Sequence, residues 1–214
     1  MTTAPSLKRV NERNLRQACD WLASADGHLA TVLELYGTPP LCARPAGFAT
    51  LLRIILEQQV SLASARACFE KLEAAVGEVT PEAVMTLNDA ELKSVGFSRQ
   101  KTAYARHLSA AVIEQELDLD ALERMPDPDA KSHLQRVKGV GEWTSDIYLL
   151  MALRRPDIMP RGDIALHAAY QKLASLGTRP AADDFLGIAA RWSPFRSVAA
   201  RILWHFYLSE RART

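Results

Sequence analysis

Apolar residues recur at the helical spacing of three or four positions through most of this chain. Around Asp26-Gly27 the apolar positions are Leu15, Ala18, Trp21, Leu22, Leu29, Val32, Leu33 and Tyr36. They predict two amphipathic helices separated by a turn. The same spacing begins at Phe48 and starts again at Leu62, where Ser61 is placed to cap the second helix. This part of the chain is therefore expected to be helical as well.

Residues typical of helix starts punctuate the rest of the chain. Thr80-Pro81 and Asn88, which Glu91 follows three positions later, predict two short helices. Ser98 is placed to cap a longer helix that extends to about residue 116, and Asp127-Pro128 begins another. No segment of useful length alternates apolar and polar residues in the manner of a strand. The predicted fold class is therefore all-α.

Residues 134–163 contain the most distinctive pattern in the chain. Gly139 is placed to end one helix in a left-handed conformation, and one residue separates it from Gly141. Trp143, Ile147 and Leu150 then give a second helix a buried face. Backbone amides grouped at such a turn bind anions, typically a phosphate. A Gly-x-Gly between two helices is also compatible with an ordinary helix-turn-helix, so this motif does not decide the function.

Beyond this stretch, residues 163–176, about 181–190 and 194–206 are expected to form the last three helices. Ser193 and Pro194 are placed to start the final one. Asp163 follows Gly162 and precedes an apolar helix, so its simplest interpretation is a helix N-cap. A carboxylate in that position is also kept ionised by the helix dipole.

Composition excludes several classes of protein. The 214 residues have an ordinary hydrophobic content of 48% and a net charge of +1, which neither favours nor opposes a nucleic-acid partner. Three cysteines lack metal-ligand spacing, so they are interpreted as reduced core thiols. The chain has no apolar run long enough to span a membrane and no secretory signal, which makes the cytoplasm the expected location.

Three phrases carry a resemblance to a known family. Val-Lys-Gly-Val-Gly-Glu-Trp-Thr at residues 137–144, with Asp163 beyond it, resembles the helix-hairpin-helix DNA glycosylase superfamily, and within it the alkylbase branch, 3-methyladenine DNA glycosylase II. Arg-Trp-x-Pro-Phe-Arg-Ser at 191–197 and Val-Gly-Phe-Ser-Arg-Gln-Lys at 95–101 are similar to the same family. The resemblance covers about residues 48–207 and implies the compact form without an N-terminal β domain.

The resemblance implies two helical lobes with a DNA-binding cleft between them. Residues 48–155 would form the central lobe, with the helix-hairpin-helix at about 128–153. Residues 1–47 and 156–214 would form the other lobe. The expected partner is double-stranded DNA containing alkylated bases, with no membrane partner and a monomeric enzyme. No cofactor is expected, although a monovalent cation binds the hairpin in some relatives. The cysteine count leaves no set of four for the iron–sulfur cluster that some members carry.

The resemblance also assigns roles to individual residues. The DNA backbone would be contacted by Lys138, Gly139, Val140, Gly141 and Thr144. Gln58 or Gln59 would fill the gap left by an extruded nucleotide, although two glutamines at a helix end are equally typical of a solvated terminus. Asp163 would be catalytic, because a carboxylate stabilises positive charge on deoxyribose.

Trp143, Trp192 and Ile147 would line the base pocket. Ile147 stands where the bacterial family tends to have a tyrosine, which implies a more aliphatic pocket. In lyase-type members the position of Trp143 is a lysine, so the expected enzyme is a monofunctional glycosylase that leaves an abasic site. The alternatives are a glycosylase for another damaged or mismatched base and a non-catalytic helix-hairpin-helix DNA-binding protein.

Overall fold

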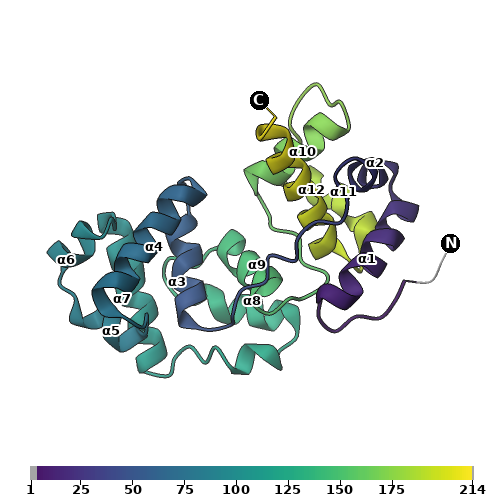
Figure 1. The fold of residues 1–214 in the computed structure, drawn as a ribbon. Coiled ribbons are helices and arrows are strands. Elements are labelled where there is room, and N and C mark those ends of the chain that lie inside the picture. Colours follow the sequence, from purple (N-terminus) through teal and green to yellow (C-terminus); the bar gives the residue numbers. More distant parts are fainter. Residues whose placement is uncertain (1–3, 214) are drawn as a thin grey trace. The chain divides into compact units, whose positions relative to one another are not determined.

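The computed structural model of this chain describes residues 4–213, and the regular elements within those residues are all helices (Figure 1). The α-helices are α1 (Glu12–Ala25), α2 (Gly27–Tyr36), α3 (Phe48–Glu57), α4 (Leu62–Val76), α5 (Pro81–Thr86), α6 (Asp89–Ser94), α7 (Arg99–Ile113), α8 (Asp127–Gln135), α9 (Glu142–Met151), α10 (Ile164–Leu173), α11 (Ala182–Ala189) and α12 (Arg196–Arg211). Short 3-10 helices, η1 (Ala121–Glu123) and η2 (Ala190–Trp192), complete the set. The all-α prediction is confirmed.

The chain divides into two units. The central unit is Arg44–Ala152, and the terminal unit is Met1–Ala43 together with Leu153–Thr214. The boundaries expected from the sequence, after residues 47 and 155, lie a few residues beyond these. Each unit has its own buried helices, so each is described separately.

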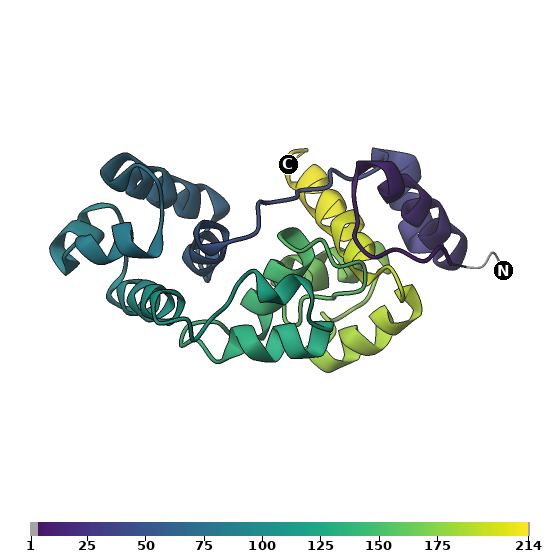
Figure 2. The same cartoon turned by 90° about the horizontal axis from the view of Figure 1, so that it is seen from below.

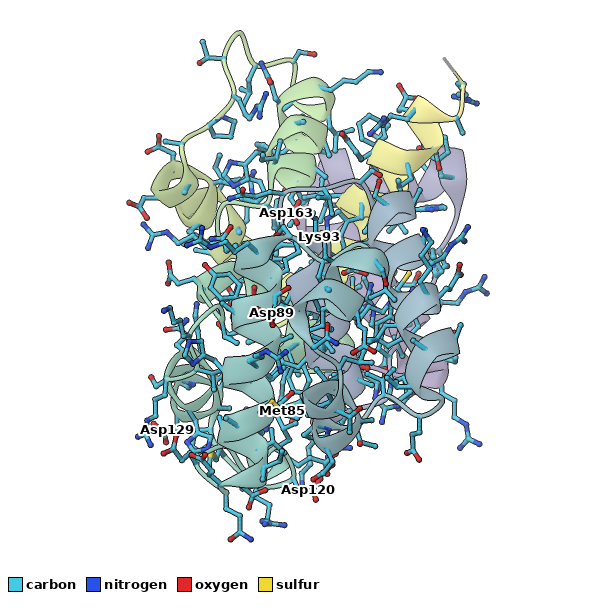
Figure 3. All side chains as sticks on the ribbon, turned by 90° about the vertical axis from the view of Figure 1, so that its left-hand side faces the viewer. Met85, Asp89, Lys93, Asp120, Asp129 and Asp163 are labelled. Atoms are coloured by element: carbon cyan, nitrogen blue, oxygen red, sulfur yellow. The ribbon has the colours of Figure 1, made fainter. Side chains whose placement is uncertain are left out.

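In the central unit, α3 is the helix around which the others are arranged. It packs against α4, α7 and α9, while α8 packs against α9 and α5 against α7. Leu51, Leu52, Ile54 and Ile55 of α3 are completely buried. Ser61 and Ser98 accept hydrogen bonds from the first turns of α4 and α7, as their positions before apolar helices predicted. Arg106 of α7 forms an ion pair with Asp89 of α6. Asp89 is labelled in Figure 3.

In the terminal unit, the yellow α12 lies beside the purple α1 and α2, as Figure 2 shows, and it also packs against α10. Every residue from Ser197 to Leu203 is buried. Arg201 is buried too, and its guanidinium donates to the carbonyls of Leu41 and Ser197 at 2.7 and 2.9 Å. A buried guanidinium requires such acceptors, so this residue fixes the segment after α2 against α12.

The start of α12 differs from the prediction. The helix begins at Arg196 rather than at Pro194, and Phe195 is its N-cap. Ser193 does not cap it, because its hydroxyl donates to Asp157 at 2.8 Å. Arg196 binds the same carboxylate through Nε at 2.8 Å and Nη2 at 2.9 Å. The segment before α12 is therefore held by a tertiary contact rather than by a local cap.

Candidate active site

The hairpin between α8 and α9, residues 136–141, is held tightly at Gly139. This residue has a φ of +98°, which an L side chain rarely adopts. A Cβ at this position would lie 2.4 Å from Cγ of Tyr104, a side chain of α7. Two independent reasons therefore require glycine at this position: the positive φ and the close contact with the Tyr104 ring. Lys138 and Gly141 are exposed, whereas Val140 is buried and anchors the turn.

The first turn of α9 follows directly from Gly141, which is its N-cap and has no side chain with which to cap it. The positive end of the helix dipole thus lies at the hairpin. Glu142 adds a negative charge there, but Lys131 of α8 lies 3.5 Å from it and 2.9 Å from the buried Asp146. These contacts hold the acidic side chain toward α8, so the hairpin keeps its suitability for an anion.

The two candidate wedge residues have different environments. Gln58 is the C-cap of α3 and its amide nitrogen bonds to Gly139 O and Thr144 Oγ1, each at 2.8 Å. Gln59 is exposed and has a φ of +57°. Val60 beside it is 45% exposed. The tip of the junction, which we define as Gln59 and Val60, is therefore the part that can meet a partner, and sequence inspection had not singled out Val60.

The side chain of Thr144, the fifth residue predicted to contact the DNA backbone, is buried. Its side chain is 2% exposed, and its hydroxyl accepts the bond from Gln58. The hydroxyl of Thr144 is therefore used inside the central unit, so a contact of this residue with the DNA backbone would have to come from its main-chain amide, and it stays a prediction. The other four predicted positions, Lys138 to Gly141, form the turn itself.

The two predicted pocket residues of α9 also differ from each other. Trp143 is partly exposed near the start of the helix. Ile147, one turn further on, is 2% exposed and packs with the buried face of the helix. The prediction that Ile147 lines an open base pocket is therefore corrected to a core position.

Asp163 is the N-cap of α10, as its position before an apolar helix predicted. Its Oδ1 accepts a hydrogen bond from the amide of Leu166 at 3.0 Å and one from Nε1 of Trp204 at 3.2 Å. The residue is 8% exposed, and Figure 3 labels it at the start of its helix. Two donors aimed at one oxygen hold the carboxylate in one orientation.

Trp204 was missed by the sequence analysis. It belongs to α12, it is partly exposed, and it contacts Asp163 directly. An aromatic ring at helical spacing on an apolar helix is usually a core residue, so no local signal distinguishes it. Only the folded chain brings its indole to the carboxylate.

Trp192, predicted to line the base pocket, is instead a core residue. It is completely buried, and its Nε1 donates to Asp26 at 2.8 Å. Tyr170 and Phe185 pack against it edge to face, with ring centroids 5.8 and 6.1 Å away. No face of the ring is open to a base, so the prediction is corrected: Trp192 ties η2 to the N-cap of α2.

The hairpin carbonyls were considered as ligands for a monovalent cation. Those of Val137, Gly139 and Gly141 accept hydrogen bonds from Val140 N, Gln58 Nε2 and Ser145 N respectively. In residues 4–213, no three His, Cys, Asp or Glu side chains are grouped so as to hold a metal ion. Binding of a monovalent cation at the hairpin stays a prediction.

The comparisons with known proteins agree with this geometry. Residues 52–194 match the model of the HhH-GPD superfamily base excision DNA repair proteins. The chain belongs to this superfamily.

No helix of the described residues has the length and apolar character needed to cross a membrane.

Relatives within the superfamily have names that describe an alkylbase activity. The Schizosaccharomyces pombe 3-methyladenine DNA glycosylase Mag1, solved in complex with abasic DNA, superposes with a TM-score of 0.83 at 26% identity, covering 88% of this chain and 95% of that one. A Bacillus halodurans DNA-3-methyladenine glycosidase gives 0.77 at 27%, covering 91% of each chain. A Bacillus subtilis DNA-3-methyladenine glycosylase is 26% identical over 204 residues, which is 84% of this chain and 67% of the relative.

Proposed function

We propose that this protein is a monofunctional DNA glycosylase that hydrolyses the N-glycosidic bond of alkylated purines of the 3-methyladenine type in double-stranded DNA. The observation that carries the proposal is Asp163, a nearly buried carboxylate fixed by Leu166 and by the indole of Trp204. Membership of the superfamily supports a role in base excision repair. The names of the relatives support an alkylated base as the substrate.

The proposed reaction breaks the bond between C1′ of deoxyribose and the base nitrogen. The bonding electron pair leaves with the base, and positive charge develops on the sugar. Asp163 stabilises that charge, because a preorganised carboxylate in a partly dry site acts more strongly than water. Water then adds to C1′ and loses a proton, which gives a free base and an abasic site. The strand itself is not cut.

The base must leave the duplex before this chemistry can occur, at a cost of roughly a few kcal/mol. In our proposal the hairpin holds a phosphate through main-chain amides, with Lys138 adding a charge, and the tip of the junction fills the vacated gap. Backbone contacts of this kind carry no sequence information, which suits an enzyme that scans DNA. Gln59 and Val60 are exposed for that role, while the amide of Gln58 is already bonded within the central unit.

An alkylated purine is cationic, so it departs as a neutral base and needs no general acid. An aromatic face attracts such a cation, with a favourable energy of about 0.5–2 kcal/mol. Trp204 is partly exposed and is the aromatic residue that we assign to the base, while Trp143, a partly exposed residue of the central unit, stays a candidate from the sequence. Trp204 replaces Trp192 in this role, because it has an accessible surface and contacts Asp163.

The decisive experiment compares Asp163→Asn with the wild type on alkylated duplex DNA. Asparagine is also a good N-cap, so α10 is retained while the charge is lost. We expect the single-turnover rate of base release to fall by about 10²–10³-fold, the scale of one preorganised electrostatic contact, with DNA affinity preserved. The matched control is Asp184→Asn, which removes an exposed carboxylate from α11 of the same unit. Wild-type base release by Asp163→Asn would refute the mechanism.

The experiment also separates the two alternatives. A non-catalytic DNA-binding protein would bind the duplex and release no base in any variant. A glycosylase for another lesion would release a different base, so the substrates should include 3-methyladenine, 7-methylguanine, ethenoadenine, hypoxanthine and 8-oxoguanine. We expect the cationic methylated purines to be released fastest.

A further inference from the structure

The side chain of Gln58 connects the end of α3 to the hairpin. Its Nε2 lies 2.8 Å from Gly139 O and 2.8 Å from Thr144 Oγ1. A main-chain carbonyl can only accept, so the atom facing Gly139 must be the amide nitrogen rather than its oxygen. That nitrogen has two hydrogens, and the two contacts use both. Gln58 thus joins three elements of the central unit: α3, the hairpin and α9.

Helix α7 fixes the same two segments from a second direction. The Tyr104 ring occupies the space where a Cβ of residue 139 would lie, so it packs directly against Gly139. One turn earlier on α7, Nζ of Lys101 donates to the carbonyl of Leu56, in the last turn of α3. Partial burial lowers the pKa of Lys101 from its ordinary value, in keeping with an amine that lies against the end of α3. The end of α3 and the hairpin are therefore both anchored to α7.

The tip begins immediately after this anchored point. Gln58 is held, whereas Gln59 turns into the left-handed region and is exposed together with Val60. A single peptide unit joins Gln58, whose side chain is hydrogen-bonded, to Gln59, which is exposed. Gln58, the residue that precedes the tip, is therefore linked directly to the hairpin.

We infer that Gln58 is a positioning residue that holds the tip in register with the phosphate-binding hairpin. The inference rests on the proposed function, because it assigns the tip to the gap and the hairpin to a nearby phosphate of the same duplex. Both contacts can form together only if their separation matches the DNA. Fixing that separation before binding lowers the cost of ordering the two segments, and a misplacement of about 1 Å can cost 10²-fold in rate.

The test measures how strongly the tip and Gln58 depend on each other. The ligand is a duplex with a tetrahydrofuran abasic-site analogue, and an intact duplex of the same sequence serves as reference. The tip variant carries Gln59→Ala and Val60→Ala, and it is made in the wild type and in Gln58→Met, which keeps the length of the side chain but removes its hydrogens. We expect the tip variant to weaken abasic-site affinity by about tenfold in the wild type and by about twofold in Gln58→Met, since contacting residues couple non-additively.

Three controls make the result interpretable. Gln115→Met introduces the same change at an exposed position of the central unit, and it should leave the tenfold effect intact. Gln58→Asn keeps the amide but shortens its reach, so it should behave as Gln58→Met does and replaces that variant if it does not fold. Thermal melting of each variant shows whether the fold is retained, since loss of stability alone does not change the ratio of the two tip effects.

The outcomes separate the inference from the proposed function. If the tip substitutions weaken abasic-site affinity by the same factor with and without the Gln58 amide, the inference is wrong. The glycosylase proposal would still stand. A wild-type protein that bound abasic and intact duplexes equally, and released no alkylated base, would overturn both. We expect the tip substitutions to weaken abasic-site affinity less in both Gln58 variants than in the wild type. In Gln115→Met they should weaken it as much as in the wild type.

Discussion

Trp204 donates its indole N–H to Oδ1 of Asp163 over 3.2 Å, although 41 positions separate the two residues in the chain. The same oxygen accepts the amide of Leu166. Two hydrogen bonds to one oxygen restrict the rotation of the carboxylate. Trp204 therefore orients the carboxylate that we propose as catalytic, and the residue is itself partly exposed.

Trp204→Phe separates these two contributions. Phenylalanine keeps an aromatic face but has no N–H, so Asp163 loses one donor. A hydrogen bond to a charged group contributes about 1.5–3 kcal/mol, and we expect single-turnover base release to fall by roughly tenfold or more. Trp204→Ala should lose the aromatic surface as well and raise the KM for alkylated DNA. Release by Trp204→Phe at the wild-type rate would show that the contact has no part in the reaction.

Trp192→Phe is expected to affect stability instead. The change removes the donor to the buried Asp26 and leaves a small cavity among Tyr170 and Phe185. Loss of such a bond costs about 1–3 kcal/mol, and each kcal/mol lowers the Tm of a chain of this size by about 2–4 °C. Base release per folded molecule should be unchanged. A reduced rate with an unchanged Tm would place Trp192 at the base after all.

Lys138→Ala tests the phosphate contact of the hairpin. Each phosphate neutralised by a lysine releases counterions, so the slope of log K against log salt should decrease in magnitude by about 0.9. Affinity should fall to a similar extent for damaged and undamaged duplexes, because a backbone contact is not sequence-specific. Lys93→Ala is the matched control: Lys93 is an exposed residue of α6, labelled in Figure 3. An unchanged salt slope in Lys138→Ala would remove this residue from the interface.

The helices were predictable because their signals are local. Thr80, Asn88 and Ser98 each cap the helix that follows them, as their side chains indicated. Ser193 failed as a cap because Asp157, far from it in sequence, bonds its hydroxyl. A short-range pattern cannot register such a competing partner.

The candidate site was predictable to a different extent. Asp163 and the hairpin lie in or near sequence motifs that resemble the family, but the assignments of Trp143, Trp192, Gln58 and Gln59 depended on tertiary contacts. Trp192 is completely buried and donates to Asp26, whereas Trp204 is partly exposed and donates to Asp163, and neither difference is visible in the sequence. Gln58 and Gln59 are adjacent, yet one bonds to a carbonyl 81 positions away and the other faces outward. Periodicity does not contain this information.

The last prediction concerns strand cleavage. A lyase needs an amine that attacks C1′ and forms a Schiff base. In lyase-type members of the family a lysine supplies this amine, and the resemblance places Trp143 at the equivalent position. The indole of a tryptophan is not a nucleophile. The wild-type protein should convert alkylated duplex to abasic sites that break only after alkali or heat. Borohydride, which reduces a Schiff base to a stable amine, should trap no protein–DNA complex during the reaction. A known bifunctional glycosylase on its own substrate provides the positive control, and a trapped complex with this protein would contradict the monofunctional assignment.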